Sequence, residues 1–236
     1  MIVTDTSIVG MRNRRLALRL VGVLLAAFAA FAQTEHPITG RKIAPVMGSA
    51  GADWLERSER EKEEAPEAAL DNMTLREGMV VADIGAGTGY FSIRLAKRVG
   101  PSGKVYAVDV QPEMLDRLRG RLTKAGVTNV LPVLGREDDP KLPANQVDVV
   151  LLVDVYHEFS QPQRMLQAIR TALKQDGRLI LLEYRKEDPS IPIRPDHKMS
   201  IADVKAELEA EGFKMEKVSD NLPRQHLFVF VKARPN

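Results

Sequence analysis

The chain has 236 residues, of which 44% are hydrophobic and 28% are charged, a composition typical of one globular domain with an appendage. The formal net charge is +2, and the first 32 residues, with four arginines and one aspartate, account for that excess. A nearly neutral body argues against nucleic acid as a partner, because binding to a phosphate backbone needs a basic surface. The sequence has no cysteine, which excludes disulfides, thiolate metal sites and cysteine nucleophiles.

Residues 1–32 predict a removable export signal. An arginine-rich patch at 11–15 precedes an apolar run at 20–31, and Ala30-Phe31-Ala32 has the small-x-small pattern of a cleavage site. The apolar run is shorter than the roughly 20 residues that a helix needs to cross a bilayer, so we expect no stable membrane span. We therefore expect a mature chain beginning at Gln33 in the periplasm or cell envelope. The alternative is a cytoplasmic protein whose hydrophobic first helix packs on the domain.

Residues 33–74 predict an N-terminal arm ahead of a domain over residues 75–236. The arm begins with a stretch rich in proline and glycine at 36–51, and a charged pattern over about 52–64 predicts a helix.

Strand and helix patterns alternate through the rest of the chain. Continuous apolar runs such as 147–153 are typical of strands covered on both faces, and alternating order indicates a parallel sheet. Near the end, a capping pattern at 200–203 predicts a helix to about 211, followed by two strands in an antiparallel hairpin. Together these elements predict an α/β, doubly wound, mostly parallel seven-stranded sheet. The predicted strands are 79–84, 105–110, 130–134, 147–153, 178–183, 213–218 and 225–231, and the helices between them are 91–99, 112–125 and 162–173.

A glycine-rich turn, Asp83-Ile-Gly-Ala-Gly-Thr-Gly89, joins the first predicted strand to its helix. Glycines lack a Cβ, so the backbone amides of such a turn can approach a ligand closely. The turn departs from the dinucleotide pattern G-x-G-x-x-G, because Tyr90 stands where the third glycine would be. The carboxylate of Asp83 at the strand end is suited to a cationic amino group. We predict cofactor contacts from Asp83, Gly85, Ala86, Gly87, Gly89 and Tyr90.

The second predicted strand ends near Asp109, which is followed by Val110. A carboxylate at this strand end can accept hydrogen bonds from both hydroxyls of a ribose, so we add both residues to the predicted cofactor site. Together the glycine turn and Asp109 resemble the first two motifs of class I S-adenosylmethionine-dependent methyltransferases. The resemblance implies a Rossmann-like fold, S-adenosyl-L-methionine as cofactor, and an N-terminal arm that covers the substrate.

The resemblance extends over roughly residues 75–232, and the body is similar to ubiquinone/menaquinone-biosynthesis C-methyltransferases. In such enzymes an acidic residue after the third strand meets the adenine amino group. Here Glu137 and Asp138 are both available in a loop that is longer than usual. We favour Glu137, and either side chain could instead be a solvated loop charge.

Asp154, His157 and Glu158 follow the fourth predicted strand, where ligands bind in open α/β sheets. We predict that these three residues form the catalytic group, with His157 or Glu158 taking a proton from the acceptor. Contact with the cofactor and structural hydrogen bonding are the alternatives. The three lack a diagnostic metal-binding spacing, so we predict no metal site.

The predicted function is methyl transfer to a small-molecule acceptor through oxygen, carbon or nitrogen. The segment after the fourth strand reads Asp154-Val-Tyr-His157, which departs from the Asn/Asp-Pro-Pro-Tyr/Phe tetrad of many methyltransferases that act on amino groups of nucleobases or glutamine. The alternative is an exported domain that binds another adenosine ligand, or a scaffold with a relic methyltransferase site.

Overall fold

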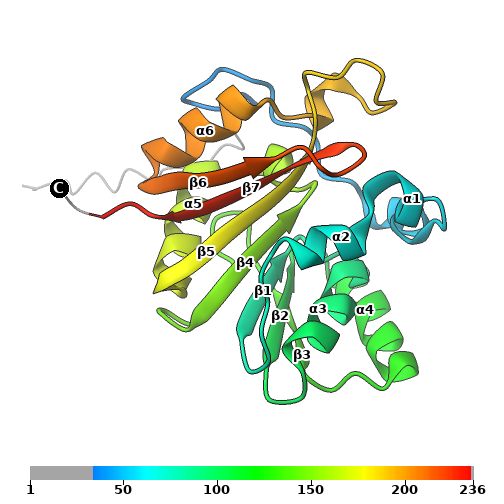
Figure 1. The fold of residues 1–236 in the computed structure, drawn as a ribbon. Coiled ribbons are helices and arrows are strands. Elements are labelled where there is room, and N and C mark those ends of the chain that lie inside the picture. Colours follow the sequence, from blue (N-terminus) through cyan, green and yellow to red (C-terminus); the bar gives the residue numbers. More distant parts are fainter. Residues whose placement is uncertain (1–33, 235–236) are drawn as a thin grey trace, which may run out of the picture. The chain divides into compact units, whose positions relative to one another are not determined.

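The computed structural model describes residues 34–234, so the predicted signal segment and its cleavage site lie outside the described residues. Figure 1 shows a twisted sheet with helices on both faces. The helices are η1 (Ser49–Glu56), α1 (Arg60–Glu64), α2 (Pro66–Asp71), α3 (Tyr90–Val99), α4 (Pro112–Ala125), η2 (Tyr156–Glu158), α5 (Pro162–Ala172), η3 (Pro195–His197) and α6 (Ile201–Ala210). The strands are β1 (Val80–Ile84), β2 (Lys104–Asp109), β3 (Val130–Leu134), β4 (Val147–Val153), β5 (Leu173–Tyr184), β6 (Phe213–Ser219) and β7 (Gln225–Lys232).

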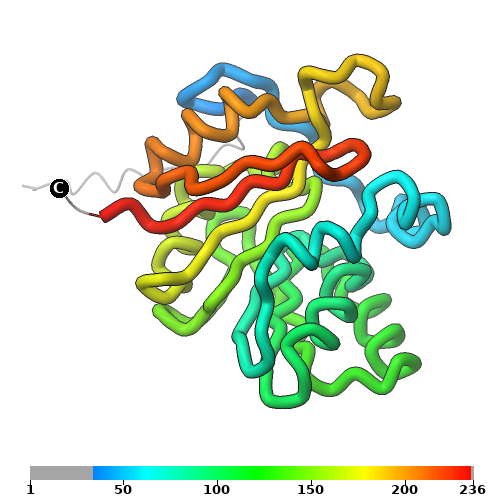
Figure 2. Tube along the Cα trace, in the orientation of Figure 1, coloured from blue at the N-terminus to red at the C-terminus, as the bar shows by residue number. Residues whose placement is uncertain are grey.

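The sheet has seven strands in the order β3-β2-β1-β4-β5-β7-β6. The first five pair in parallel, whereas β7 is antiparallel to both β5 and β6. Figure 2 shows β7, in red, lying along β5 in yellow. The predicted doubly wound, mostly parallel sheet with a C-terminal antiparallel hairpin is therefore confirmed.

Helices cover the two faces of the sheet with two separate apolar cores. One core joins α2, α3 and α4 to strand residues such as Val149 and Leu151. The other joins α5 and α6 to the alternate residues Val150 and Leu152. Because successive strand side chains point to opposite faces, a strand with helices on both sides buries apolar side chains on both faces. This explains the apolar run 149–153 of β4.

The arm departs from the single helix predicted over 52–64. The 3-10 helix η1 ends at Glu56, the next residue, Arg57, leaves helical geometry with ψ of 142°, and α1 begins at Arg60. The guanidinium groups of Arg57 and Arg60 both reach the carboxylate of Glu64, at 2.8 and 2.6 Å. The predicted helix is therefore interrupted at 57–59, as tertiary context often overrides local helical propensity.

Strand β5 begins at Leu173, five residues before the predicted start. Its pairing with β4 shifts between Val147 and Val149, so that residues 174–177 form an irregularity in the strand. A Cβ on Gly177 would lie 3.0 Å from the Val147 carbonyl oxygen. A glycine at this position lets the two backbones pass closely, as is typical of strand bulges.

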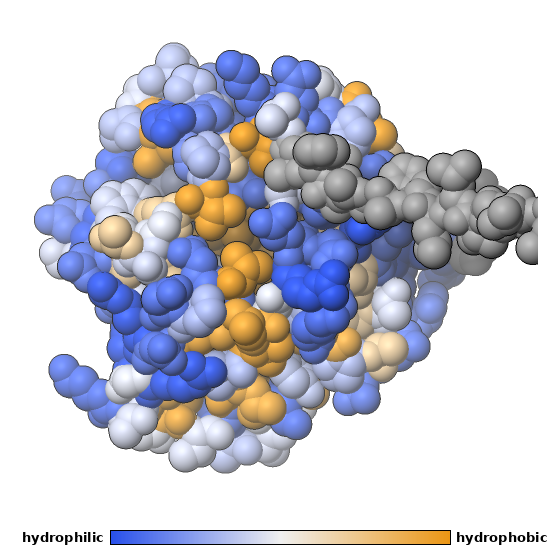
Figure 3. Space-filling model, turned by 180° about the vertical axis from the view of Figure 1, so that it is seen from behind, coloured by the Kyte–Doolittle hydropathy of each residue, from blue (hydrophilic) through white to orange (hydrophobic). Residues whose placement is uncertain are grey.

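The arm runs from α6 to α1, across segments that are distant in the sequence (Figures 1 and 2). At its start, Arg41 Nε donates a hydrogen bond to the buried carboxylate of Glu207 in α6 at 2.8 Å. Apolar side chains gather in the middle of the face opposite the view of Figure 1, bordered by hydrophilic residues (Figure 3). None of the helices within residues 34–234 is long and apolar enough to cross a membrane.

Candidate active site

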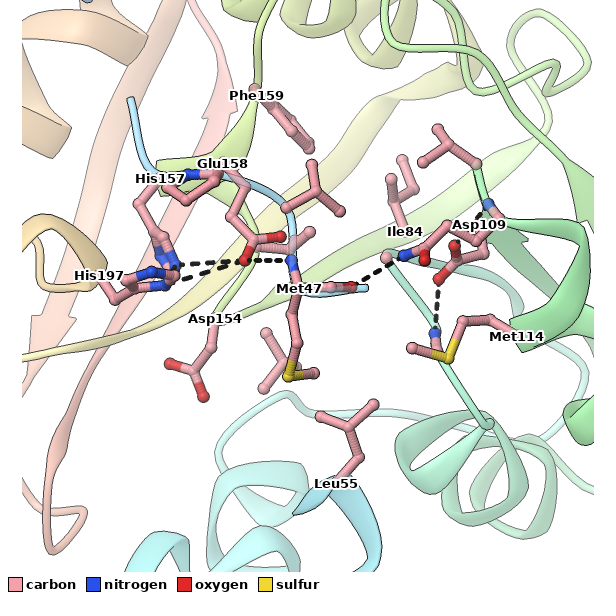
Figure 4. Close-up of a pocket in the computed structure, with 18 of the residues that line it drawn as sticks. Met47, Leu55, Ile84, Asp109, Met114, Asp154, His157, Glu158, Phe159 and His197 are labelled. Carbon is pink, nitrogen blue, oxygen red and sulfur yellow. Dashed lines mark hydrogen bonds and ion pairs between the residues drawn. The ribbon is translucent and has the colours of Figure 1, made fainter. Parts of the chain in front are cut away.

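A cavity of about 550 Å³ opens beside the carboxyl ends of β1, β2 and β4, under the N-terminal arm. Both the strand ends and the arm contribute to its wall, as Figure 4 shows for Met47, Leu55, Asp109 and Asp154. Its size lies within the range of sites for small ligands. The residues lining it are Pro45, Val46, Met47, Trp54, Leu55, Arg60, Ile84, Gly85, Gly87, Val108, Asp109, Val110, Gln111, Met114, Arg136, Glu137, Val153, Asp154, Val155, His157, Glu158, Phe159, Ser160, Met165, Tyr184, Pro192, Ile193, Arg194 and His197.

The glycine turn presents two of its glycines to the cavity, Gly85 and Gly87. Gly87 has a φ of +53°, which a residue with a side chain adopts only with strain. A Cβ on Gly87 would also lie 2.8 Å from Leu55 Cδ1 of the arm. Ala86, Gly89 and Tyr90, which the sequence assigned to the same site, do not line the cavity. The backbone of the turn therefore reaches the cavity at Gly85 and Gly87, and its contact with a cofactor stays a prediction.

Asp109 lies at the end of β2, where the sequence placed it, and its neighbour Val110 also lines the cavity. Its carboxylate accepts hydrogen bonds from the backbone amides of Gly87 at 2.8 Å and Gln111 at 2.9 Å. Burial raises the pKa of Asp109, and these amide bonds partly oppose the increase. Each carboxylate oxygen has a second acceptor site. The side chain can therefore hold the glycine turn in place and still accept hydrogen bonds from a ligand.

Asp83 lies behind the glycine turn, outside the set of residues that line the cavity. Its side chain is buried, and Oδ2 accepts a hydrogen bond from Ser92 Oγ at 2.6 Å. Burial raises its pKa to about 6, although the bond from Ser92 and the charge of Arg60 lower it. In this structure Asp83 ties β1 to α3, and direct contact with a cofactor amino group stays a prediction.

Of the two acidic candidates after β3, Glu137 lines the cavity and Asp138 does not. Glu137 Oε2 accepts a hydrogen bond from Ser160 Oγ at 2.7 Å. Asp138 instead forms ion pairs with Arg136 and Arg164 at the surface. The geometry is consistent with the choice of Glu137 for adenine recognition.

Asp154 directly follows β4 and has a left-handed backbone, with φ of +50°. Its Oδ2 accepts a hydrogen bond from the Gln225 side chain at 2.7 Å, whereas the buried Oδ1 has no hydrogen-bond partner. Burial, reinforced by the carboxylates of Glu64 and Glu183, raises the pKa of Asp154 well above its ordinary value. A buried oxygen without a hydrogen-bond partner lowers the stability of the fold unless a ligand donates a hydrogen bond to it.

His157 and Glu158 lie in η2, beside Asp154, and face His197 of η3 (Figure 4). His157 is buried between two partners. Its Nδ1 lies 2.7 Å from Glu183 Oε2, and its Nε2 lies 3.1 Å from His197 Nδ1. The structure therefore brings the three predicted catalytic residues together at one end of the cavity and adds His197 and Glu183.

Two pKa shifts characterise this end of the cavity. Burial lowers the pKa of His157, but the charge of Glu183 and its hydrogen bond outweigh burial, so that the net pKa is raised. Burial raises the pKa of Glu158 to about 7, against the opposing charge of His157.

The arm closes this cavity through backbone contacts that the sequence did not predict. The Met47 amide donates to Glu158 Oε1 at 3.3 Å, and its carbonyl accepts from the Gln111 side chain at 3.0 Å (Figure 4). Met47 thus bridges the end of β2 and η2. These contacts join segments more than 60 residues apart, so no local pattern could reveal them.

Comparisons with known proteins agree with this geometry. The family described as "Methyltransferase domain" matches residues 75–225. The chain is similar to the ubiquinone/menaquinone biosynthesis C-methyltransferase UbiE of Bordetella avium, with 37% identity over 117 residues, which are 50% of this chain and 45% of the relative. It thus spans about half the length of the curated relatives it matches.

Solved structures extend the likeness over more of the chain. A SAM-dependent methyltransferase from Aquifex aeolicus has a TM-score of 0.74 and 30% identity, covering 78% of this chain and 98% of that one. A type 11 methyltransferase, described as putative, from Sulfolobus solfataricus has a TM-score of 0.62 at 23% identity, covering 74% and 95%. The second likeness concerns the fold alone.

Proposed function

The chain belongs to the methyltransferase-domain family of class I S-adenosylmethionine-dependent enzymes, and from that premise we propose that it methylates a small-molecule acceptor. The observation that carries the proposal is the cavity in which Gly85, Gly87 and Asp109 face His157 and Glu158. Its volume suits small ligands. The nearly neutral body also disfavours a nucleic acid acceptor. The competing idea of a relic or scaffold site is not favoured by the family match.

Residues of the cavity fit S-adenosylmethionine, whose sulfonium supplies an already activated methyl group when bound. Asp109 can accept hydrogen bonds from the ribose hydroxyls, and Glu137 can accept one from the adenine amino group. The unpaired Oδ1 of Asp154 fits a cationic ammonium group. Arg60, which lines the cavity while pairing with Glu64, can attract a carboxylate. This set of donors and acceptors matches a zwitterionic nucleoside derivative.

The acceptor is assigned to the end of the cavity formed by His157, Glu158 and His197, with apolar side chains beside them. Phe159, Pro192 and Ile193 contribute that apolar surface. Methyl transfer needs alignment of nucleophile, methyl and sulfur, and exclusion of water, more than covalent help from the protein. The bridge made by Met47 covers the cavity and serves that exclusion.

A screen for methyl incorporation tests the proposal. Phenols, quinols and small acids are incubated with the protein and S-adenosylmethionine carrying a labelled methyl group. We expect one class to accept label, and we expect His157→Ala to lower the rate by about 10² to 10⁴-fold, the range for loss of a general acid or base. Asp138→Ala, outside the cavity, is the matched control and should keep the parent rate. A fully active, folded His157→Ala protein would remove His157 from the reaction.

We further propose that the protein is exported, on the strength of the N-terminal sequence pattern alone. Its expression in a bacterial host, followed by N-terminal sequencing of the periplasmic fraction, tests this. A mature chain beginning at Gln33 is expected. A full-length chain confined to the cytoplasm would contradict the export proposal and leave methyl transfer untouched.

A further inference from the structure

We propose that His157, His197 and Glu158 bind one divalent transition-metal ion in the wall of the cavity. This site is absent from the sequence-based prediction, because His197 follows Glu158 by 39 residues and the two join only through the fold. In the structure each of the three side chains offers one donor atom, and all three donor atoms lie within 4.8 Å of one another. Figure 4 shows them grouped at one end of the cavity.

The distances between the donor atoms suit a metal ion. His157 Nε2 lies 3.1 Å from His197 Nδ1, and Glu158 Oε1 lies 4.0 and 3.8 Å from these two nitrogens. The nearest point equidistant from the three atoms, which lies in their plane, is about 2.1 Å from each, the usual bond length from zinc to imidazole nitrogen or carboxylate oxygen. An ion therefore fits between these side chains with little movement.

A second observation concerns the residue behind His157. Glu183 Oε2 lies 2.7 Å from His157 Nδ1, and the other oxygen, Oε1, accepts the Tyr156 backbone amide at 2.9 Å. Glu183 is fully buried, so this carboxylate is held in one orientation. A carboxylate behind a histidine fixes the ring and leaves Nε2 as the metal-binding nitrogen, an arrangement that recurs around protein metal ions.

The donor set also indicates which ions fit. Two imidazoles and one carboxylate suit zinc, iron or another first-row transition ion, whereas magnesium and calcium prefer oxygen ligands. Three protein ligands leave coordination positions open for water or substrate. All three ligands line the cavity. If the proposed function holds, an oxygen of the acceptor can occupy an open position, where the ion would favour its anionic form and replace the proton acceptor that His157 or Glu158 would otherwise be.

Titration of the tag-free protein with zinc, after treatment with a chelator, tests the site. Calorimetry should show one equivalent bound, and cobalt should give the visible absorption of an ion held by nitrogen and oxygen ligands. His197→Ala and Glu158→Gln should each weaken binding by at least about 100-fold. Glu183→Gln, which leaves the ligands in place, should weaken it by about 10 to 100-fold.

His226→Gln is the matched control, because this imidazole also meets two carboxylates, those of Asp220 and Glu187. It should bind zinc as the parent does. Zinc binding that stays unchanged in folded His197→Ala and Glu158→Gln proteins, or a parent that takes up no equivalent, would overturn the proposal. The test uses the metal alone, so its failure is separate from failure of methyl transfer, which adenosylhomocysteine binding reports independently.

Discussion

Asp109 is the single residue on which the cofactor assignment depends most. It supports the glycine turn through the Gly87 amide and also faces the cavity. Asp109→Ala should weaken adenosylhomocysteine binding by about 1.5 to 3 kcal/mol, the range for losing hydrogen bonds to a charged group. Isothermal titration calorimetry measures this. Asp138→Ala, one strand away and outside the cavity, should leave the affinity unchanged; equal affinities for the Asp109 variant and the parent would remove Asp109 from the site.

Asp83 should make the stability of the fold depend on pH. Its pKa of about 6 in the folded protein exceeds its ordinary value of 3.8, because the side chain is buried. The folded state therefore keeps a proton that the unfolded chain releases, and the contribution of Asp83 to stability is lost as the pH rises through 6. The loss between pH 3 and pH 7 amounts to about 3 kcal/mol.

Urea unfolding of the parent and Asp83→Asn across that pH range isolates this contribution. The asparagine variant cannot ionise, so its stability should fall less than that of the parent as the pH rises. If both proteins showed the same pH dependence, Asp83 would keep an ordinary pKa in the folded state.

At the residue scale, the site residues that directly follow strands could be predicted from the sequence. Site residues that lie in other segments of the chain were missed. Asp109, Asp154 and His157 could be placed because the carboxyl ends of parallel strands meet at one edge of a sheet. Glu183 also ends a strand and was available to the same reasoning. His197 could not be found in this way, since it lies in a short 3-10 helix whose position depends on tertiary contacts.

At the scale of elements, the glycine turn lies close to the arm, with Gly87 beside Leu55. Gly87→Val should abolish measurable adenosylhomocysteine binding, because the side chain would be strained at φ of +53° and would meet Leu55. Gly120→Ala is the control, at an exposed interior position of α4 where a Cβ meets no atom within 4 Å. It should keep the affinity and add about 0.5 to 1 kcal/mol of stability. Normal binding by Gly87→Val would exclude the turn from the site.

Helix α1 of the arm contains a buried ion pair between Arg60 and Glu64, one turn apart. Glu64 also accepts a hydrogen bond from Tyr184 Oη of β5 at 2.8 Å. Arg60→Met should destabilise the fold by about 3 kcal/mol or more, because it removes one partner of a buried charge. The double variant Arg60→Met/Glu64→Met should lose less than the sum of the two single variants. Strict additivity in denaturant unfolding would show that the two side chains do not interact in the folded state.

Element boundaries were predictable where local chemistry decides them. Helix α4 begins at Pro112 and ends before Gly126, and its bounds agree with the prediction, since proline favours a first helical position and glycine a position after the last. The arm was not predictable in the same way. There the chain leaves helical geometry at Arg57, a break that no local pattern marks.

At the scale of the whole molecule, the alternation of strands and helices was sufficient to predict the sheet and its final hairpin. Alternation also predicts where ligands bind, because the carboxyl edge of such a sheet is the open edge. Which other residues line the cavity at that edge depends on the N-terminal arm and on the segment between β5 and α6. These segments bring Met47 and His197 to the cavity. These segments carry no periodic pattern, so only the folded structure places them.

The central claim is that this cavity holds S-adenosylmethionine, and calorimetric titration of the parent protein with adenosylhomocysteine tests it most directly. We predict saturable binding of one equivalent, lost or strongly weakened in Asp109→Ala, with no comparable binding of NAD or ATP. Ligand that binds the native state should also raise the unfolding temperature, by an amount that grows with the logarithm of its concentration above Kd. Failure of adenosylhomocysteine to bind, or equal binding of NAD, would contradict the account.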